Sequence, residues 1–219
     1  MKSIKLINKI EEDENIKTFI FERADLQYKA GQYIIISLKG EDPTRAFSLS
    51  SSPTEDLLMI STHIRDTPFK RKLNSLDIGS EVNIRGPFGN FILKVDFNQI
   101  VMMAGGIGIT PFRSMIKYAS DKGLKNEITL LYSNKNSKFL YKNDLDNIAK
   151  KKHIKIIYTV TGSDPEWKGR YGRIDEAMVK EYCNLDSLFY ICGPPNMVNS
   201  LSNMLKNMGV KNILTEGFT

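Results

Sequence analysis

The chain has 219 residues, of which 41% are hydrophobic and 26% charged, and a formal net charge of +6. These values are typical of a globular protein with one large or two compact domains, and they exclude a disordered chain, a collagen-like repeat and a disulfide scaffold. Two cysteines cannot supply the four thiolates of a plant-type iron–sulfur cluster. The cysteines and the two histidines also lack the close spacing of a structural zinc site, so we expect no metal centre.

Residues up to about 97 have the pattern of short β-strands separated by turns. The predicted strands are residues 4–10, 16–21, 33–38, 47–50, 57–64 and 81–85, with one helix over residues 69–76. Many short strands with regularly spaced turn signals are typical of an antiparallel barrel or sandwich.

From about residue 99 the pattern changes to alternating strands and helices. The predicted strands are residues 100–103, 127–132, 154–160, 188–191 and 212–214, and the predicted helices are 111–121, 141–150, 175–182 and 196–208. Continuous apolar strands that alternate with amphipathic helices indicate a parallel sheet covered on both faces. The boundary between the two halves falls near residues 95–98.

The first strand of the second half ends in a glycine-rich turn, AGGIGITP over residues 104–111. Glycines let a backbone approach an anion closely. Thr110 can cap a helix that Pro111 opens, so that amide groups point at a phosphate. The alternative is a tight strand–helix connection that binds nothing.

The strand over residues 188–191 ends in Cys192, Gly193 and Pro194. This position places Cys192 at the carboxyl edge of the sheet, where parallel sheets bind their ligands. A buried structural cysteine is the alternative. No histidine is near in sequence to act as a base, so we do not expect Cys192 to act as a nucleophile.

In the first half, Arg45, Ala46, Phe47 and Ser48 lie on a predicted strand, where alternation puts Arg45 and Phe47 on one face. Arginine suits phosphate binding, and an aromatic ring can lie against a flat heterocycle. An ordinary strand with a surface arginine is the alternative.

The segment 67–71 opens a predicted helix and contains Lys70 and Arg71. Cations at a helix N-terminus oppose the helix dipole, so a bound anion there would relieve a local cost.

RAFS (residues 45–48), GPFGNF (86–91), AGGIGITP and CGPPNM (192–197), in this order, resemble the ferredoxin–NADP⁺ reductase family of flavoproteins over essentially the whole chain. The resemblance implies an α+β two-domain fold. Residues 1–97 would form an FAD-binding antiparallel β-barrel, and residues 98–219 a Rossmann-like α/β domain with a parallel sheet that binds NAD(P).

The resemblance also implies an oxidoreductase that transfers hydride from NADPH or NADH to FAD and passes electrons to a separate acceptor such as ferredoxin or flavodoxin. One alternative is the reductase subunit of a multicomponent oxygenase or another electron-transfer complex. Another is a flavin-free module that keeps the fold without the redox role.

For FAD, the resemblance implies that Arg45 binds the pyrophosphate, that Phe47 packs on the isoalloxazine and that Ser48 lies near its N5. Phenylalanine stands where the family more often has tyrosine, and residues 69–71 stand where other members have a small-residue and serine pattern. The other residues implied to contact FAD are Ala46, His63, Ile64, Arg65, Phe69, Lys70, Arg71 and Phe218.

For the nicotinamide nucleotide, the resemblance implies that Cys192 abuts the nicotinamide ring and that Glu216 lies near flavin N5, so Ser48, Cys192 and Glu216 are the expected catalytic residues. A frayed surface carboxylate is the alternative for Glu216. The other residues implied to contact NAD(P)H are Gly105, Gly106, Gly108, Thr110, Pro111, Gly193 and Pro194.

Nucleotide preference depends on the residues that come directly after the second strand of the Rossmann-like half. A serine with a lysine there, Ser133 and Lys135, can accept a 2′-phosphate, and Arg170 and Arg173 in the predicted loop 167–173 would add charge. These residues favour NADPH, with a solvated loop as the alternative.

The positive charge suits an acidic redox partner through salt-sensitive association. We expect the run of lysines over residues 150–152 to cap a helix C-terminus rather than bind nucleic acid. With no secretory signal and no apolar stretch of about 20 residues, we expect a cytoplasmic protein without a membrane span.

Overall fold

The structure is a computed structural model that describes residues 2–39, 44–151 and 153–217. Its chain divides into two compact units. The first unit is Met1–Leu93 with Arg113–Tyr118, and the second is Lys94–Phe112 with Ala119–Thr219.

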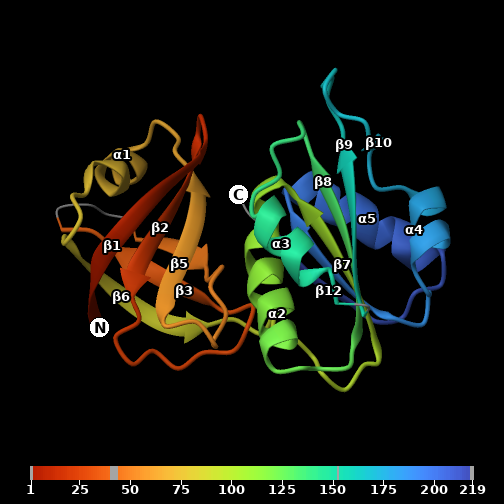
Figure 1. Cartoon of the computed structure of the whole chain (residues 1–219), viewed down its shortest axis with the longest axis horizontal. Helices are drawn as coiled ribbons and strands as arrows, with labels where there is room; N and C mark the ends of the chain where they lie inside the picture. The colour runs from red at the N-terminus through yellow and green to blue at the C-terminus, as the bar shows by residue number, and fades with distance from the viewer. Residues whose placement is uncertain (1, 40–43, 152, 218–219) are drawn as a thin grey trace. The chain divides into compact units, whose positions relative to one another are not determined.

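The first unit is built on one six-stranded antiparallel sheet with the strand order β4-β3-β6-β1-β2-β5 (Figure 1). Its elements are β1 (Lys2–Asp13), β2 (Ile16–Glu22), β3 (Tyr33–Ser37), β4 (Arg45–Ser48), β5 (Leu57–His63), α1 (Pro68–Ser75) and β6 (Glu81–Phe88). The prediction of an antiparallel first half is confirmed. Strand β4 begins two residues before the predicted strand 47–50, so the whole RAFS sequence lies in it.

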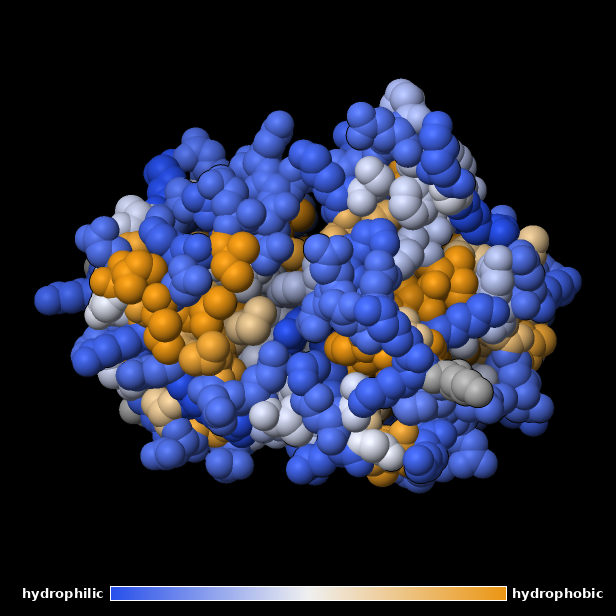
Figure 2. Space-filling view, in the orientation of Figure 1, coloured by the Kyte–Doolittle hydropathy of each residue, from blue (hydrophilic) through white to orange (hydrophobic). Residues whose placement is uncertain are grey.

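Helix α1 packs on the core of the first unit. Thr67 caps its N-terminus by accepting a hydrogen bond from the Lys70 amide at 3.4 Å, and Phe69 and Leu73, one turn apart, are its buried residues. On β1, Ile4 is fully buried whereas Ile7 and Ile10 are 43% and 40% exposed. Figure 2 shows the apolar surface that gathers over β1, β2 and β5.

The second unit contains one six-stranded parallel sheet with the order β10-β9-β8-β7-β11-β12. Its elements are β7 (Gln99–Gly105), a 3₁₀ turn (Gly106–Gly108), α2 (Ile109–Asp121), β8 (Glu127–Asn134), α3 (Lys142–Ile148), β9 (Ile154–Val160), β10 (Arg170–Tyr171), α4 (Glu176–Tyr182), β11 (Leu188–Gly193), α5 (Pro195–Asn207) and β12 (Ile213–Gly217). The predicted parallel α/β half is confirmed. Helices α4 and α5 share one core with β7 and β11, and α3 lies on the opposite face of the sheet (Figure 1).

Two local features differ from the sequence prediction. The predicted loop 167–173 contains strand β10, whose two residues pair with Thr159 and Val160 of β9 and are too few to show a periodic pattern. Lys151 caps the C-terminus of α2, where its Nζ donates to the Ser120 carbonyl at 2.8 Å, rather than that of α3. Lys152 lies outside the described residues.

No helix in the described part of the chain combines the length and the apolar character needed to cross a bilayer.

Candidate cofactor-binding sites

In the first unit, strand β4 and helix α1 bring the RAFS sequence and the segment 67–71 together. The Phe47 and Phe69 rings stack with centroids 6.0 Å apart and planes at 29°. The Arg45 guanidinium carbon lies 5.7 Å from the centroid of the Phe69 ring, within cation–π range. The RAFS strand and the segment 67–71, which the sequence analysis treated as separate candidate anion sites, therefore lie in contact and form a single candidate site.

Lys70 of α1 points into the same place. Its Nζ lies 4.4 Å from the centroid of the Phe47 ring and donates a hydrogen bond to the Thr62 hydroxyl. Burial, followed by the positive charges of Arg65 and Arg45, lowers the pKa of Lys70 to about 8. Arg45, Arg65 and Lys70 are hereafter called the cation cluster.

The neighbouring Arg71 is in a different environment. Its guanidinium forms an exposed ion pair with Asp66, so the two adjacent cations predicted to act together do not share one role. Of this pair, Lys70 faces the cation cluster and Arg71 already has a carboxylate partner.

The remaining predicted FAD residues of the first unit differ in exposure. Phe47 and Ser48 are buried, with only 7% and 6% of their surface exposed. Ala46, which precedes them on β4, is exposed. His63 ends β5, and burial together with Arg65 and Lys70 lowers its pKa against the opposing effect of Asp13. Ile64 packs on the hydrophobic core.

The donor set of the cation cluster fits an anionic diphosphate. Like charges that are drawn together and partly removed from water raise the free energy of the unliganded site. A bound anion would replace that repulsion with charge-assisted hydrogen bonds, which are about twice as strong as neutral ones. The residues present therefore suit the diphosphate of a dinucleotide cofactor.

Sequence reasoning missed a buried ion pair next to the RAFS strand. Arg113 donates from Nη1 to Glu55 Oε2 at 2.6 Å and from Nη2 to Glu55 Oε1 at 3.0 Å, and Nη1 also donates to the Ser50 carbonyl at 2.9 Å. Only 7% of the Arg113 side chain and 22% of the Glu55 side chain are exposed. The partners are 58 residues apart, so no local pattern relates them.

In the second unit, the register of the parallel sheet gathers most of the predicted nucleotide residues at its carboxyl edge. Gly105 of β7 lies opposite Ser133 of β8, and Cys192 of β11 lies between Ala104 and Glu216 on the neighbouring strands. This edge is where open parallel sheets bind their ligands.

The positions of the 104–111 turn require glycine for different structural reasons. A Cβ on Gly108 would lie 2.2 Å from the Cys192 carbonyl oxygen, and one on Gly105 would lie 2.3 Å from the Met197 sulfur. Gly108 thus lets the 3₁₀ turn approach the end of β11, and Gly105 lets the end of β7 approach α5. Gly106, with φ +52°, faces open space, because its nearest neighbour would be the Asn134 Oδ1 at 3.9 Å.

The prediction that Thr110 caps a helix opened by Pro111 is wrong. Helix α2 begins at Ile109, directly after the 3₁₀ turn, so Thr110 and Pro111 lie inside its first turn. The buried Thr110 hydroxyl donates to the Ile107 carbonyl at 3.1 Å. Because the 3₁₀ turn runs directly into the α-helix, the helix starts earlier than a threonine cap would place it.

Cys192 is fully buried, and burial together with the negative charge of Glu216 raises the pKa of its thiol well above the usual value. The thiol is therefore neutral, in agreement with the prediction that it is not a nucleophile. Glu216 is half-buried on β12 and pairs in register with Cys192, so it is not a frayed terminal carboxylate. Phe218 lies outside the described residues.

The residues that led us to predict NADPH differ in how accessible they are to a bound 2′-phosphate. Ser133 is only 8% exposed, while Lys135 and Arg173 are exposed. Arg170 forms ion pairs with Glu181 at 3.1 Å and Asp175 at 3.9 Å, so its charge is compensated.

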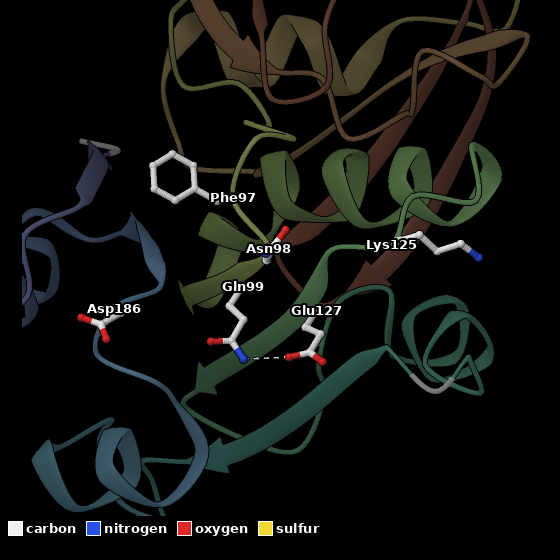
Figure 3. Close-up of a pocket in the computed structure, with 6 residues that line it drawn as sticks. All are labelled: Phe97, Asn98, Gln99, Lys125, Glu127 and Asp186. Atoms are coloured by element: carbon white, nitrogen blue, oxygen red, sulfur yellow. Dashed lines mark hydrogen bonds between the residues drawn. The ribbon is translucent and has the colours of Figure 1, made fainter.

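An open groove lies at the amino edge of the same sheet, where β7 and β8 begin. In Figure 3, Gln99 and Glu127 point toward each other and form a hydrogen bond of 2.8 Å, whereas Lys125 extends away from them. The residues that line it are Phe97, Asn98, Gln99, Lys125, Glu127 and Asp186. It lies at the end of the strands opposite to the ligand-binding edge, so it contributes nothing to the nucleotide site.

Comparison with protein families matches each half of the chain to one model. Residues 3–92 match the oxidoreductase FAD-binding domain, and residues 102–203 match the oxidoreductase NAD-binding domain.

Three known proteins illustrate the similarity. Protein RfbI of Salmonella typhimurium is 29% identical over 206 residues, which are 90% of this chain and 61% of that protein. Phenol 2-monooxygenase reductase component DmpP of a Pseudomonas species is 30% identical over 191 residues, which are 80% of this chain and 52% of that protein. The crystal structure of the cytochrome b5 reductase domain of Ulva prolifera nitrate reductase superposes with a TM-score of 0.84 at 25% identity, over 98% of this chain and 97% of that one. The chain thus spans about half to three fifths of the length of the first two of these proteins.

Proposed function

Because the chain belongs to the ferredoxin reductase family of flavoprotein oxidoreductases, with an FAD-binding and an NAD-binding domain, we propose that it oxidises NAD(P)H and delivers the electrons to a separate redox protein. FAD, when bound, supplies the chemistry of accepting a hydride and releasing electrons. The residues of the chain bind and orient the two nucleotides. The observation that carries the proposal is the cation cluster, which lies on the segments that resemble the FAD motifs.

For FAD, we assign the diphosphate to Arg45, Arg65 and Lys70. The stacking of Phe47 on Phe69, with Lys70 over the Phe47 ring, supports a site that combines cations with aromatic surface. Ser48, next to Phe47 on β4, is assigned to the flavin N5 side. His63, Ile64, Ala46, Phe69, Arg71 and Phe218 complete the assignment made from the family motifs.

For the nicotinamide nucleotide, we assign the carboxyl edge of the parallel sheet. Gly106 supports this assignment because a Cβ there would face open space. Gly108 supports it by letting the 3₁₀ turn lie against the end of β11, and Gly105 by letting the end of β7 lie against α5. Cys192 packs against and orients the ring as a neutral thiol, without a covalent step. Glu216, which pairs with Cys192, is assigned to the same end of the site. Thr110, Pro111, Gly193 and Pro194 complete it.

For the nucleotide, we propose NADPH. The exposed cations Lys135 and Arg173 support binding of the 2′-phosphate of NADPH. Ser133 is buried, so we assign it a smaller role in this binding than the sequence suggested. Replacement of Lys135 with glutamate is expected to raise the KM for NADPH and leave that for NADH nearly unchanged. An equal effect on both nucleotides would contradict a role in binding the 2′-phosphate.

For the acceptor, we propose an acidic ferredoxin or flavodoxin in the cytoplasm, supported by the net charge of +6. The second candidate is a role as the reductase component of an oxygenase. It is supported by the relatives named as reductase components of phenol 2-monooxygenase and terephthalate 1,2-dioxygenase.

The test is anaerobic reduction of the purified protein by NADPH and NADH in parallel, followed by a panel of one-electron acceptors. A yellow protein whose visible flavin absorbance is bleached by NAD(P)H supports the proposal. A colourless protein that takes up no added FAD would instead support a flavin-free module. Acceleration of ferredoxin or flavodoxin reduction that is lost at high salt separates the first acceptor class from the second.

A further inference from the structure

Lys70 is the one member of the cation cluster that is not an arginine. It lies in the first turn of α1. Its ammonium group is half-buried, lies over the Phe47 ring and donates to the Thr62 hydroxyl. An arginine keeps its proton at any physiological pH, whereas a crowded lysine can lose it.

Resting on the proposed function, we propose that Lys70 makes FAD binding proton-linked, so that the empty site takes up a proton at Lys70 when the FAD diphosphate binds. The geometry supports this because the ammonium of Lys70 lies 4.4 Å from the centroid of the Phe47 ring, and the Arg45 guanidinium lies over the Phe69 ring that stacks on Phe47. A bound diphosphate reverses the sign of the field at Lys70 and favours its charged form.

The groups that face Lys70 come from three segments. Arg45 and the Phe47 ring lie on β4, Thr62 and His63 on β5, and Arg65 in the segment between β5 and α1. The charges that act on Lys70 from these segments are positive. The pKa of His63 is lowered from 6.5, so His63 is neutral above neutral pH in the FAD-free protein. Any proton that FAD draws to His63 would remain in the Lys70 variants, which separates the two groups.

The direction of the pH dependence follows from linkage. Without FAD, burial and the two arginines hold the pKa of Lys70 at about 8, so the ammonium is charged below that pH and neutral above it. FAD raises this pKa, because the diphosphate favours the ammonium. Affinity for FAD is therefore greatest below about pH 8 and falls as pH rises above it, until the pH reaches the pKa of Lys70 in the FAD complex.

The test measures binding rather than turnover. The FAD-free protein is titrated with FAD across this pH range by fluorescence quenching, and calorimetry in buffers of different ionisation enthalpy counts the protons taken up. In the wild type we expect little proton uptake well below pH 8 and uptake that rises toward one proton per site above it. The Lys70→Arg variant keeps the charge without the titration and should show pH-independent affinity with no uptake.

Two further variants make the result unambiguous. Lys70→Gln should bind FAD more weakly at pH 7 and lose the pH dependence. This variant tests the inference even if the arginine of Lys70→Arg does not fit the site. Lys72→Arg changes an exposed lysine of the same helix and should keep the wild-type slope. Any ionisation of FAD itself is common to all variants.

A wild-type affinity that is constant over this range, or a slope retained in both Lys70 variants, would overturn the inference and leave the proposed function standing. Failure of the wild type to bind FAD at any pH would instead overturn the proposed function.

Discussion

The buried pair of Glu55 and Arg113 should dominate the electrostatic stability of the first unit. Replacing Glu55 with glutamine leaves a guanidinium that is only 7% exposed without its anion. Removing one partner of a buried pair costs about 3–5 kcal/mol, because the charge that remains is uncompensated. For a chain of this size, such a loss lowers the midpoint of thermal unfolding by about 10 °C.

The assay is thermal release of FAD, followed by flavin fluorescence, because FAD binding requires the folded first unit. Glu11→Gln is the matched control, since it breaks the ion pair of Glu11 with Lys17, in which the Glu11 side chain is 67% exposed. Such pairs contribute about 0–1 kcal/mol. Adding Arg113→Met to Glu55→Gln should recover part of the loss by removing the buried charge. The reasoning fails if Glu55→Gln behaves like the control.

The same pair predicts how stability depends on pH. Burial alone would raise the pKa of Glu55, but the Arg113 guanidinium and the Ser52 amide outweigh it and hold the pKa below its usual value of 4.5. A carboxyl group with a depressed pKa contributes stability above its unfolded-state pKa, and this contribution is lost as pH falls through the folded-state value. The stability difference between wild type and Glu55→Gln should therefore shrink in acid and be constant at neutral pH.

Three further substitutions test the two sites. Arg45→Ala should weaken FAD binding by about tenfold or more, because an anion loses a charged donor, and unchanged flavin occupancy would contradict the assignment. Cys192→Ser should slow flavin reduction by NAD(P)H in stopped-flow measurements while FAD stays bound, and release of FAD would show that the cysteine is wrongly assigned. Gly108→Ala should cost about 1–3 kcal/mol in thermal unfolding, because its Cβ would lie 2.2 Å from a backbone oxygen. Gly217→Ala, where a Cβ meets nothing within 4 Å, is the control.

The sequence pattern predicted most elements because the helices bury one face, whereas the central parallel strands β7 and β11 are buried on both faces and form continuous apolar runs. Helix α1 shows this, since Phe69 and Leu73 repeat at a helical spacing and Thr67 caps it. The same reasoning missed β10, because two residues carry no period and their pairing depends on β9, ten residues earlier in the chain.

The parts of the candidate sites that lie in short sequence motifs could be predicted from the sequence. The contacts between residues far apart in the chain could not. RAFS and the 67–71 segment could each be recognised, but their convergence depends on the fold that stacks Phe47 on Phe69. The glycines of the 104–111 turn were recognised as unusual for one reason, anion approach, although Gly108 is required by its contact with the Cys192 carbonyl. A glycine in a sequence can indicate that a side chain would not fit there, but it does not show which neighbouring group would clash with that side chain.

The two groups of cations in the first unit show how the structure separates scaffold from binding site. Arg113 is buried and matched by a bidentate carboxylate and a carbonyl, so its charge is satisfied within the fold. Lys70 is partly buried, and its burial, followed by the positive charges of Arg65 and Arg45, lowers its pKa. An anion that binds beside Lys70 would favour its charged form, because the charges that act on it within the fold are positive. We therefore assign the cation cluster to the FAD diphosphate and the buried pair to stability.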